Sequence, residues 1–126
     1  MKSPLIKMRV IFCGTRLDIP SFREKIIEAL HALDSESTTI IHGGCSGVDR
    51  VTDFEARKLG FRVEVFPADW KKYGRSAGPI RNKEMLDSGA DRVYAFPHPS
   101  LEKSAGTKDM VTRSKKAKIP VTIFQE

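Results

Sequence analysis

Residues 42–49, His-Gly-Gly-Cys-Ser-Gly-Val-Asp, form a glycine-rich stretch of a kind that suits the binding of an anion. The stretch contains three glycines: Gly43, Gly44 and Gly47. Glycine has no Cβ, so it allows positive φ and lets another group approach the backbone closely. A helix that begins after such a turn leaves N–H groups unpaired, and these donors favour a phosphate. The alternative is a plain strand-to-helix turn in which Ser46 and Asp49 form a capping box.

Two further segments place glycine beside polar or cationic side chains. Gly14, Thr15 and Arg16 follow an apolar run, while Gly106 and Thr107 begin an amphipathic segment. Glycine and threonine at the start of a helix offer backbone and hydroxyl donors to an anion. We therefore expect both segments to contribute to the same phosphate site.

Residues 67–79 form a long stretch that is rich in aromatic and basic side chains. Trp70 and Tyr73 could stack on a base or a ribose, although aromatic residues in a loop more often close the end of a core. Arg81 and Asn82 follow in the first turn of a predicted helix. We expect Arg81 to supply positive charge to the phosphate.

The apolar periodicity predicts strands alternating with helices. The predicted strands cover residues 8–13, 39–42, 61–66, 92–96 and 119–124. The predicted helices begin near Pro20 and then cover residues 48–59, 79–88 and 107–117, with residues 67–78 as a loop without regular structure. The strand at 61–66 alternates apolar and charged residues, which is typical of a sheet edge.

Strands that alternate with helices form a parallel sheet, covered by helices on both faces because the crossovers are right-handed. We predict one α/β domain over residues 1–126, a Rossmann-like three-layer sandwich with strand order 3-2-1-4-5. In that order the switch point lies between the first and fourth strands, so the loops after these strands border the ligand crevice. The three glycine-bearing segments then converge there.

Composition and charge narrow the class of protein. The net charge is +6, and residues 61–126 carry 13 Lys and Arg against 8 Asp and Glu. Four cations at 113–118 are spaced around a helix end, which favours a solvated surface over a nucleic-acid patch. Two cysteines, Cys13 and Cys45, and three scattered histidines form no metal or disulfide pattern. We expect neither a metal nor a cofactor.

The sequence was searched for a membrane span and for a signal peptide. No apolar run reaches the length of a membrane span, and residues 1–8 lack the apolar centre of a signal peptide. We therefore expect a cytoplasmic protein that does not contact a membrane.

Five motifs in order, GTR, HGGCSGVDR, PADWKKYGRSAGPIRNKEM, DRVYAFP and GTKDM, resemble the SLOG superfamily and, within it, the YspA-like, cpYpsA-related branch. The resemblance spans residues 8–124. It implies a Rossmannoid fold that binds nucleotides or nucleotide-derived ligands. More distantly, the chain is similar to the LONELY GUY phosphoribohydrolases and to the DNA-processing DprA proteins.

The resemblance to the phosphoribohydrolases implies roles for particular residues. Those enzymes cleave the N-glycosidic bond of a nucleoside monophosphate with an Arg in R-K-x-x-M and a Glu in G-G-x-G-T-x-x-E. Arg81 lies at the Arg position, and Gly106 and Thr107 match the phosphate-binding Gly-Thr. Met110 occupies the Glu position, and Asp109 is one residue early, which turns a carboxylate by about 100° around a helix.

We therefore predict that the domain binds a nucleotide or nucleotide-derived phosphate ligand, for sensing or nucleotide processing. One alternative is a hydrolase or transferase acting on the N-glycosidic bond, with Arg81 as phosphate anchor and Asp109 or Asp49 as the carboxylate. Another is DprA-like nucleic-acid binding, since the Gly-Gly-x-x-Gly-x-Asp loop is shared. The superfamily also implies a homodimer, with apolar residues of 48–59 or 79–88 in its interface.

Overall fold

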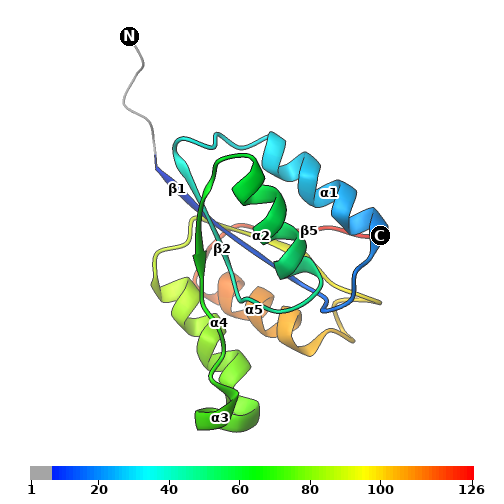
Figure 1. Cartoon of the computed structure of the whole chain (residues 1–126). Helices are drawn as coiled ribbons and strands as arrows, with labels where there is room; N and C mark the ends of the chain where they lie inside the picture. Colours follow the sequence, from blue (N-terminus) through cyan, green and yellow to red (C-terminus); the bar gives the residue numbers. More distant parts are fainter. Residues whose placement is uncertain (1–6) are drawn as a thin grey trace.

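The computed structural model describes residues 7–126, which form an α/β fold of three layers (Figure 1). Five parallel strands lie in the order β3-β2-β1-β4-β5. The strands are β1 Met8–Gly14, β2 Thr38–His42, β3 Arg62–Val65, β4 Arg92–Phe96 and β5 Val121–Ile123. The predicted fold class and strand order are confirmed. Residues 1–6, part of the segment searched for a signal peptide, lie outside the described residues.

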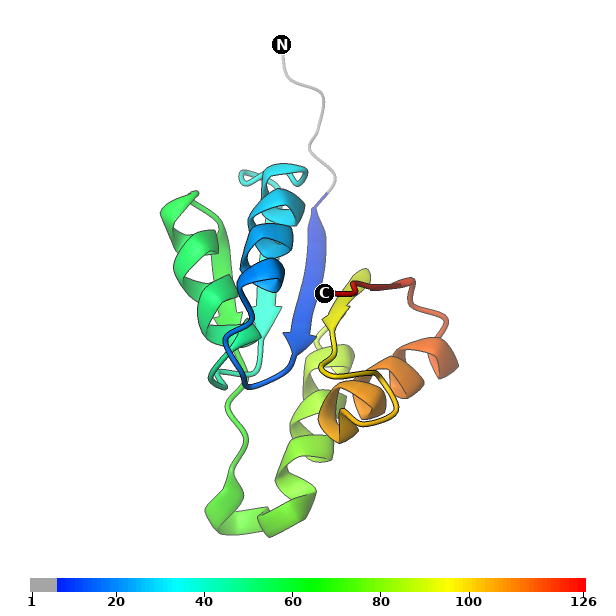
Figure 2. The same ribbon diagram turned by 90° about the vertical axis from the view of Figure 1, so that its right-hand side faces the viewer.

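Helices connect the strands and cover both faces of the sheet (Figures 1 and 2). They are α1 Pro20–His31, α2 Val48–Lys58, α3 Trp70–Tyr73, α4 Ala77–Asp87 and α5 Ala105–Lys116, with a 3-10 turn, η1, at Gly74–Ser76. Helices α1 and α2 pack on one face, and α4 and α5 pack on the other. None of the helices within residues 7–126 has the length and apolar character needed to cross a bilayer.

Alternation along β1 divides its side chains between two cores. Val10 and Phe12 face the core beneath α1 and α2, whereas Ile11 and Cys13 face the core beneath α4 and α5. Val10, Ile11 and Phe12 are fully buried, as a central strand covered on both sides requires. This continuous apolar run fixes β1 at the centre of the sheet, and its end therefore lies at the switch point.

The prediction that residues 67–78 lack regular structure is wrong. Asp69 caps α3, since its side chain accepts the Lys72 N–H at 3.1 Å, and η1 leads directly into α4 at Ala77. The Asp cap outweighs the surrounding Gly and Pro because it satisfies an otherwise free helix donor. Figure 2 shows this helical segment projecting beyond the carboxyl ends of the strands.

Other boundaries move by one or two residues. Helix α5 begins at Ala105, two residues before the predicted start, and β5 covers only Val121–Ile123 of the predicted 119–124. Ile119 lies beyond the end of α5 at Lys116, and its N–H donates to the Ser114 carbonyl of the last turn at 2.9 Å. The earlier start of α5 places Gly106 and Thr107 inside its first turn.

Candidate functional site

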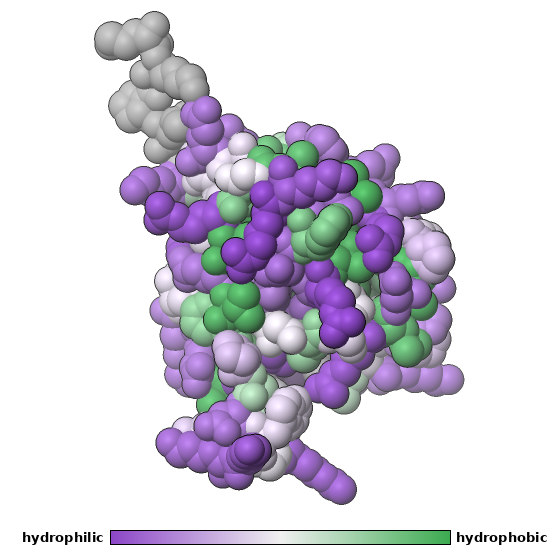
Figure 3. Space-filling model, in the orientation of Figure 1, coloured by the Kyte–Doolittle hydropathy of each residue, from purple (hydrophilic) through white to green (hydrophobic). Residues whose placement is uncertain are grey.

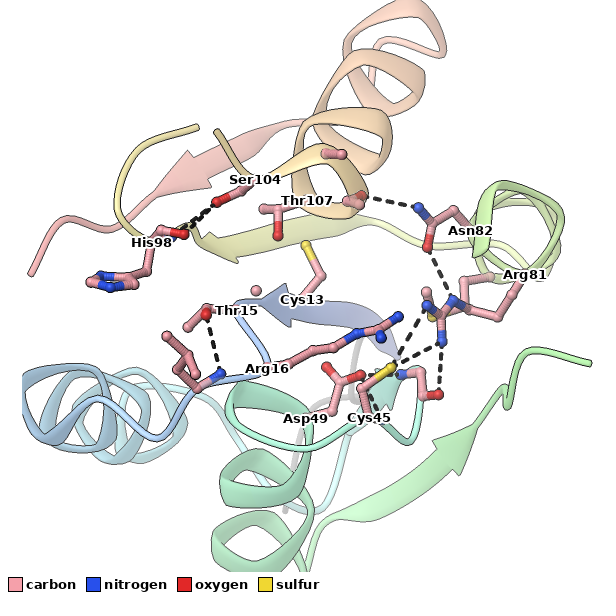
Figure 4. A pocket seen from close by; sticks show the side chains of 16 residues that line it. Cys13, Thr15, Arg16, Cys45, Asp49, Arg81, Asn82, His98, Ser104 and Thr107 are labelled. Carbon is pink, nitrogen blue, oxygen red and sulfur yellow. Dashed lines mark hydrogen bonds between the residues drawn. The ribbon is translucent and has the colours of Figure 1, made fainter. Parts of the chain in front are cut away.

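The loops after β1, β2 and β4 surround a cavity of about 330 Å³ at the carboxyl edge of the sheet (Figure 4). The cavity lies at the predicted switch point, because β1 pairs with β4 while their following helices leave on opposite faces. Its walls include nine residues that the sequence predicted for the site: Gly14, Thr15, Arg16, Gly43, Asp49, Arg81, Asn82, Gly106 and Thr107.

The glycine loop between β2 and α2 pairs its own backbone donors internally. The Asp49 Oδ2 atom accepts the N–H groups of Gly43 at 3.2 Å and Cys45 at 3.1 Å. The N–H of Gly44 donates to Nδ1 of His42 at 3.0 Å. Three donors that the sequence analysis assigned to a phosphate therefore already have acceptors in the chain.

The end of the glycine loop is fastened to the loop after β1. Ser46 Oγ donates to the Arg16 carbonyl at 2.9 Å, and the Val48 N–H donates to the Thr15 carbonyl at 3.0 Å. Gly47, at φ +73°, is the N-cap of α2, and a Cβ there would lie 2.4 Å from the Thr15 carbonyl oxygen. The capping box between Ser46 and Asp49 is therefore not formed.

His42 holds the start of the glycine loop against α2. Its imidazole is buried, and Nε2 lies 2.8 Å from the Asp53 carboxylate, which also accepts from Arg57 at 3.0 Å. Because Nδ1 accepts the Gly44 N–H, these contacts assign the ring proton to Nε2. Burial raises the pKa of Asp53, but the hydrogen bonds from His42 and Arg57 outweigh it, so that pKa is lowered overall.

Asp49 is a buried carboxylate in the wall of the cavity. Asp49 is only 7% exposed, and this burial raises the pKa of its carboxyl group. The Cys45 N–H and the nearby His42 and Arg81 act in the opposite direction but do not outweigh burial. Oδ2 holds the glycine loop, whereas Oδ1 has no partner among residues 7–126. The second oxygen is therefore available to a ligand in the cavity.

Arg81, near the start of α4, anchors the glycine loop from inside. Its Nη1 donates to the Gly43 carbonyl at 2.7 Å and lies 3.5 Å from the Phe66 carbonyl, and the residue is 9% exposed. A Cβ on Gly43 would lie 2.1 Å from that Nη1, so glycine is required for this approach. Arg81 therefore directs its hydrogen bonds to the protein itself: two backbone carbonyls, the Asn82 amide and the Cys45 sulfur.

Asn82 links Arg81 to the first turn of α5. Its Oδ1 accepts from Arg81 Nε at 3.1 Å, and its Nδ2 donates to the Gly106 carbonyl at 3.2 Å and to Asp109 at 3.0 Å. Asp109 also accepts from Arg113 at 2.9 Å and is absent from the described residues that line the cavity. Met110, at the hydrolases' Glu position, is fully buried in the core.

The N-terminus of α5 opens into the cavity without a side-chain cap. The N-cap residue Ser104 uses its hydroxyl on the His98 backbone, accepting the N–H at 3.1 Å and donating to the carbonyl at 2.9 Å. The N–H groups of the first turn therefore lack an intrahelical acceptor. Thr107, 5% exposed, points its side chain toward the cavity (Figure 4), and its hydroxyl has no partner within the described chain.

The aromatic residues predicted to stack lie outside this cavity. Trp70 is 46% exposed and lies in a neighbouring hollow of about 270 Å³, where the Arg16 guanidinium is 5.3 Å from its ring centre. Gly44 and Ser46 line the same hollow, and Tyr73 lines none of the described cavities. Arg16 is shared by the cavity and the hollow, so it lies between the two.

Several lining residues were missed by the sequence analysis. Cys13 lies at the end of β1, and burial strongly raises the pKa of its thiol; Cys45 lies 3.9 Å from the Arg81 guanidinium. His98 and Ser104 come from the loop after β4. Cys13 ends a predicted strand, and the others lie in loops between a predicted strand and the next predicted helix. That position was the available signal. No cluster of three potential metal ligands occurs in residues 7–126.

Comparisons with known proteins agree with this architecture. The model of the YspA, cpYpsA-related SLOG family matches residues 8–73. The Gene 61 protein of Mycobacterium phage D29 is 37% identical over 123 residues, which cover 92% of this chain and 95% of that protein.

Two solved structures share the fold. DNA processing protein A of Helicobacter pylori, described with a single-stranded DNA binding mode, has a TM-score of 0.69 at 15% identity over 96% of this chain. DprA of Streptococcus pneumoniae has a TM-score of 0.54 at 13% identity over 92% of this chain. This chain spans 66% and 58% of those two chains. The match to the family model and the 37% identity to the phage protein show the family, and the three glycine-bearing loops around one cavity agree with it. The chain belongs to the YspA, cpYpsA-related SLOG family.

Proposed function

We propose that the protein binds a nucleotide or nucleotide-derived ligand, with its phosphate at the N-terminus of α5. The main support is the uncapped first turn of that helix, which faces the cavity together with the hydroxyl of Thr107. Unpaired N–H groups and the positive end of a helix dipole bind anions without further charges. The Thr107 hydroxyl has no partner within residues 7–126, so it can donate a hydrogen bond to an anion in the cavity.

The carboxylate in the cavity wall agrees with this orientation. Asp49 and Arg16 both lie on the side of the glycine loop, opposite the start of α5 (Figure 4). Asp49 repels a phosphate from that side and the start of α5 attracts it, while the exposed Arg16 adds positive charge to the cavity as a whole. The glycine loop then acts as a scaffold, held by Asp49, His42 and Arg81.

The binding test is calorimetric titration with the common ribonucleoside 5′-mono- and diphosphates. Thr107→Val keeps the shape of the side chain but removes the hydroxyl, and we expect about a tenfold loss of affinity, the value of one hydrogen bond to a charged group. Thr112→Val, an exposed position on the same helix, is the matched control and should bind as the wild type does. Equal affinity of Thr107→Val and wild type would contradict the proposed phosphate position.

Cleavage of an N-glycosidic bond is a second candidate because a carboxylate, that of Asp49, lines the cavity. Asp109 is disfavoured as the catalytic carboxylate, because it lies outside the cavity lining and its carboxylate accepts hydrogen bonds from Asn82 and Arg113. Chromatography of the same nucleoside monophosphates after incubation tests this candidate. Base release that persists in Asp109→Asn and disappears in Asp49→Asn would establish hydrolysis; we expect binding without base release.

Nucleic-acid binding is favoured by one observation, the projecting segment at 67–76. Trp70 and Tyr73 are 46% and 39% exposed there, beside Lys71, Lys72 and Arg75. Figure 3 shows this projection as largely hydrophilic. Cations interleaved with aromatics suit single strands, whose binding weakens steeply with salt. Titration with a polynucleotide at two salt concentrations separates this candidate from a nucleotide pocket.

A further inference from the structure

A carboxylate oxygen with no protein partner faces a cavity whose other wall is built for an anion. Asp49 is more than nine-tenths buried, and its Oδ2 is fixed by two backbone N–H groups at 3.2 and 3.1 Å. Those bonds set the direction of the carboxylate, and Asp49 lines the cavity, so Oδ1 is the oxygen left for a ligand there. An unpartnered carboxylate oxygen in a cavity wall can accept a hydrogen bond from a ligand's hydroxyl group.

The two walls of the cavity differ in what they offer. Figure 4 shows Ser104 and Thr107 on one side of β1, and Asp49 and Cys45 on the other. The first side supplies donors at the start of α5. The second supplies the Asp49 acceptor, with Arg16 and Arg81 beside it. A fitting ligand therefore has an anion at one end and hydroxyl donors at the other. A ribose 5′-phosphate has this polarity, because its 2′- and 3′-hydroxyls lie across the sugar from the phosphate.

We propose that Asp49 binds the 2′,3′-diol of the ligand's ribose, an inference that rests on the proposed function. Asp49 would then select free ribonucleotides or ligands that end in a ribose. A carboxylate that accepts from ribose hydroxyls is an established way for a nucleotide fold to recognise the sugar. Internal nucleotides of a DNA or RNA strand lack a free diol, since their 3′-oxygen is esterified. The cavity volume of about 330 Å³ is at the lower end of the range for ligand pockets, which suits a single nucleotide better than a strand.

The direct test compares each ribonucleotide with its 2′,3′-dideoxy counterpart on the wild-type protein. We expect the ribonucleotide to bind at least about tenfold more tightly, since a hydrogen bond to a charged acceptor is lost in the analogue. The 2′-deoxy form then shows which hydroxyl contributes. Equal affinity for the two forms would overturn the role of Asp49 while leaving nucleotide binding in place. Failure of all nucleotides to bind would overturn the proposed function and this inference with it.

Asp49→Asn separates the two functions of this side chain. An Asn oxygen in place of Oδ2 can still accept from Gly43 and Cys45, and its NH₂ group then replaces Oδ1 at the cavity. We expect the preference for ribose to fall to about threefold or less, because only a neutral hydrogen bond remains. Affinity for the dideoxy form should stay within about threefold of wild type.

The control for this variant is Asp87→Asn, which neutralises an exposed carboxylate on α4. It should retain the full preference for ribose. Circular dichroism confirms that each variant is folded. A ribose preference in Asp49→Asn equal to that of wild type would refute the proposal.

Discussion

Replacing Gly43 by Ala tests whether Arg81 truly holds the glycine loop from inside. An added Cβ would lie 2.1 Å from Nη1 and 2.6 Å from Cζ of Arg81, far inside contact distance. The guanidinium is buried and must move, which breaks its 2.7 Å bond to the Gly43 carbonyl. Overpacking costs about 1–3 kcal/mol, and a lost hydrogen bond of a charged group costs about 1.5–3 kcal/mol.

Moving the guanidinium relieves the overlap and loses the bond, so we expect Gly43→Ala to lower the free energy of unfolding by about 2 kcal/mol. In urea this shifts the midpoint by about 1 M for a domain of this size. Gly106→Ala is the control, because a Cβ there meets nothing within 4 Å and alanine favours the helix. It should be neutral or slightly stabilising.

A double-mutant cycle isolates the clash from other effects of the new methyl group. In an Arg81→Ala background the guanidinium is gone, and Gly43→Ala should cost at most about 1 kcal/mol. If Gly43→Ala destabilises both backgrounds equally, the cost arises elsewhere, and the anchoring role of Arg81 is refuted.

Three further predictions concern charge, reactivity and assembly. Because burial raises the pKa of Asp49, its contribution to stability is greatest at low pH and is lost as pH rises through the folded pKa. The Asn side chain of Asp49→Asn cannot ionise. The free energy of unfolding of this variant, measured in urea and compared with that of wild type, should therefore increase from pH 4 to pH 8. A difference that stays constant over this range would contradict the prediction. In native protein, iodoacetamide should modify Cys45 before Cys13, whose buried thiol has a raised pKa, as read by peptide mass spectrometry; faster Cys13 labelling would refute it. If the protein is a homodimer through α2, Phe54→Ser, at a side chain 61% exposed, should shift it to monomer in light scattering at high micromolar concentration; an unchanged dimer would exclude this face.

The sequence by itself determined the architecture and the edge of the sheet at which the cavity lies. The apolar run of β1 could only be a strand buried on both faces, and the alternating helices required a parallel sheet. That order brings Gly14, Gly43 and Gly106 to one edge, and the structure places all three around one cavity. These features depend on local pattern and chain connectivity, which are legible in a single sequence.

Only the tertiary structure decided what each polar group does at that edge. Asp49 reads locally as a helix cap, yet it accepts from Gly43 and Cys45, because the fold of the loop turns those N–H groups inward. Asp109 reads as a carboxylate near the phosphate, yet Asn82 and Arg113 engage it outside the cavity. Hydrogen-bond partners are chosen by distance and direction across segments far apart in the chain, and spacing in the sequence carries no information about either.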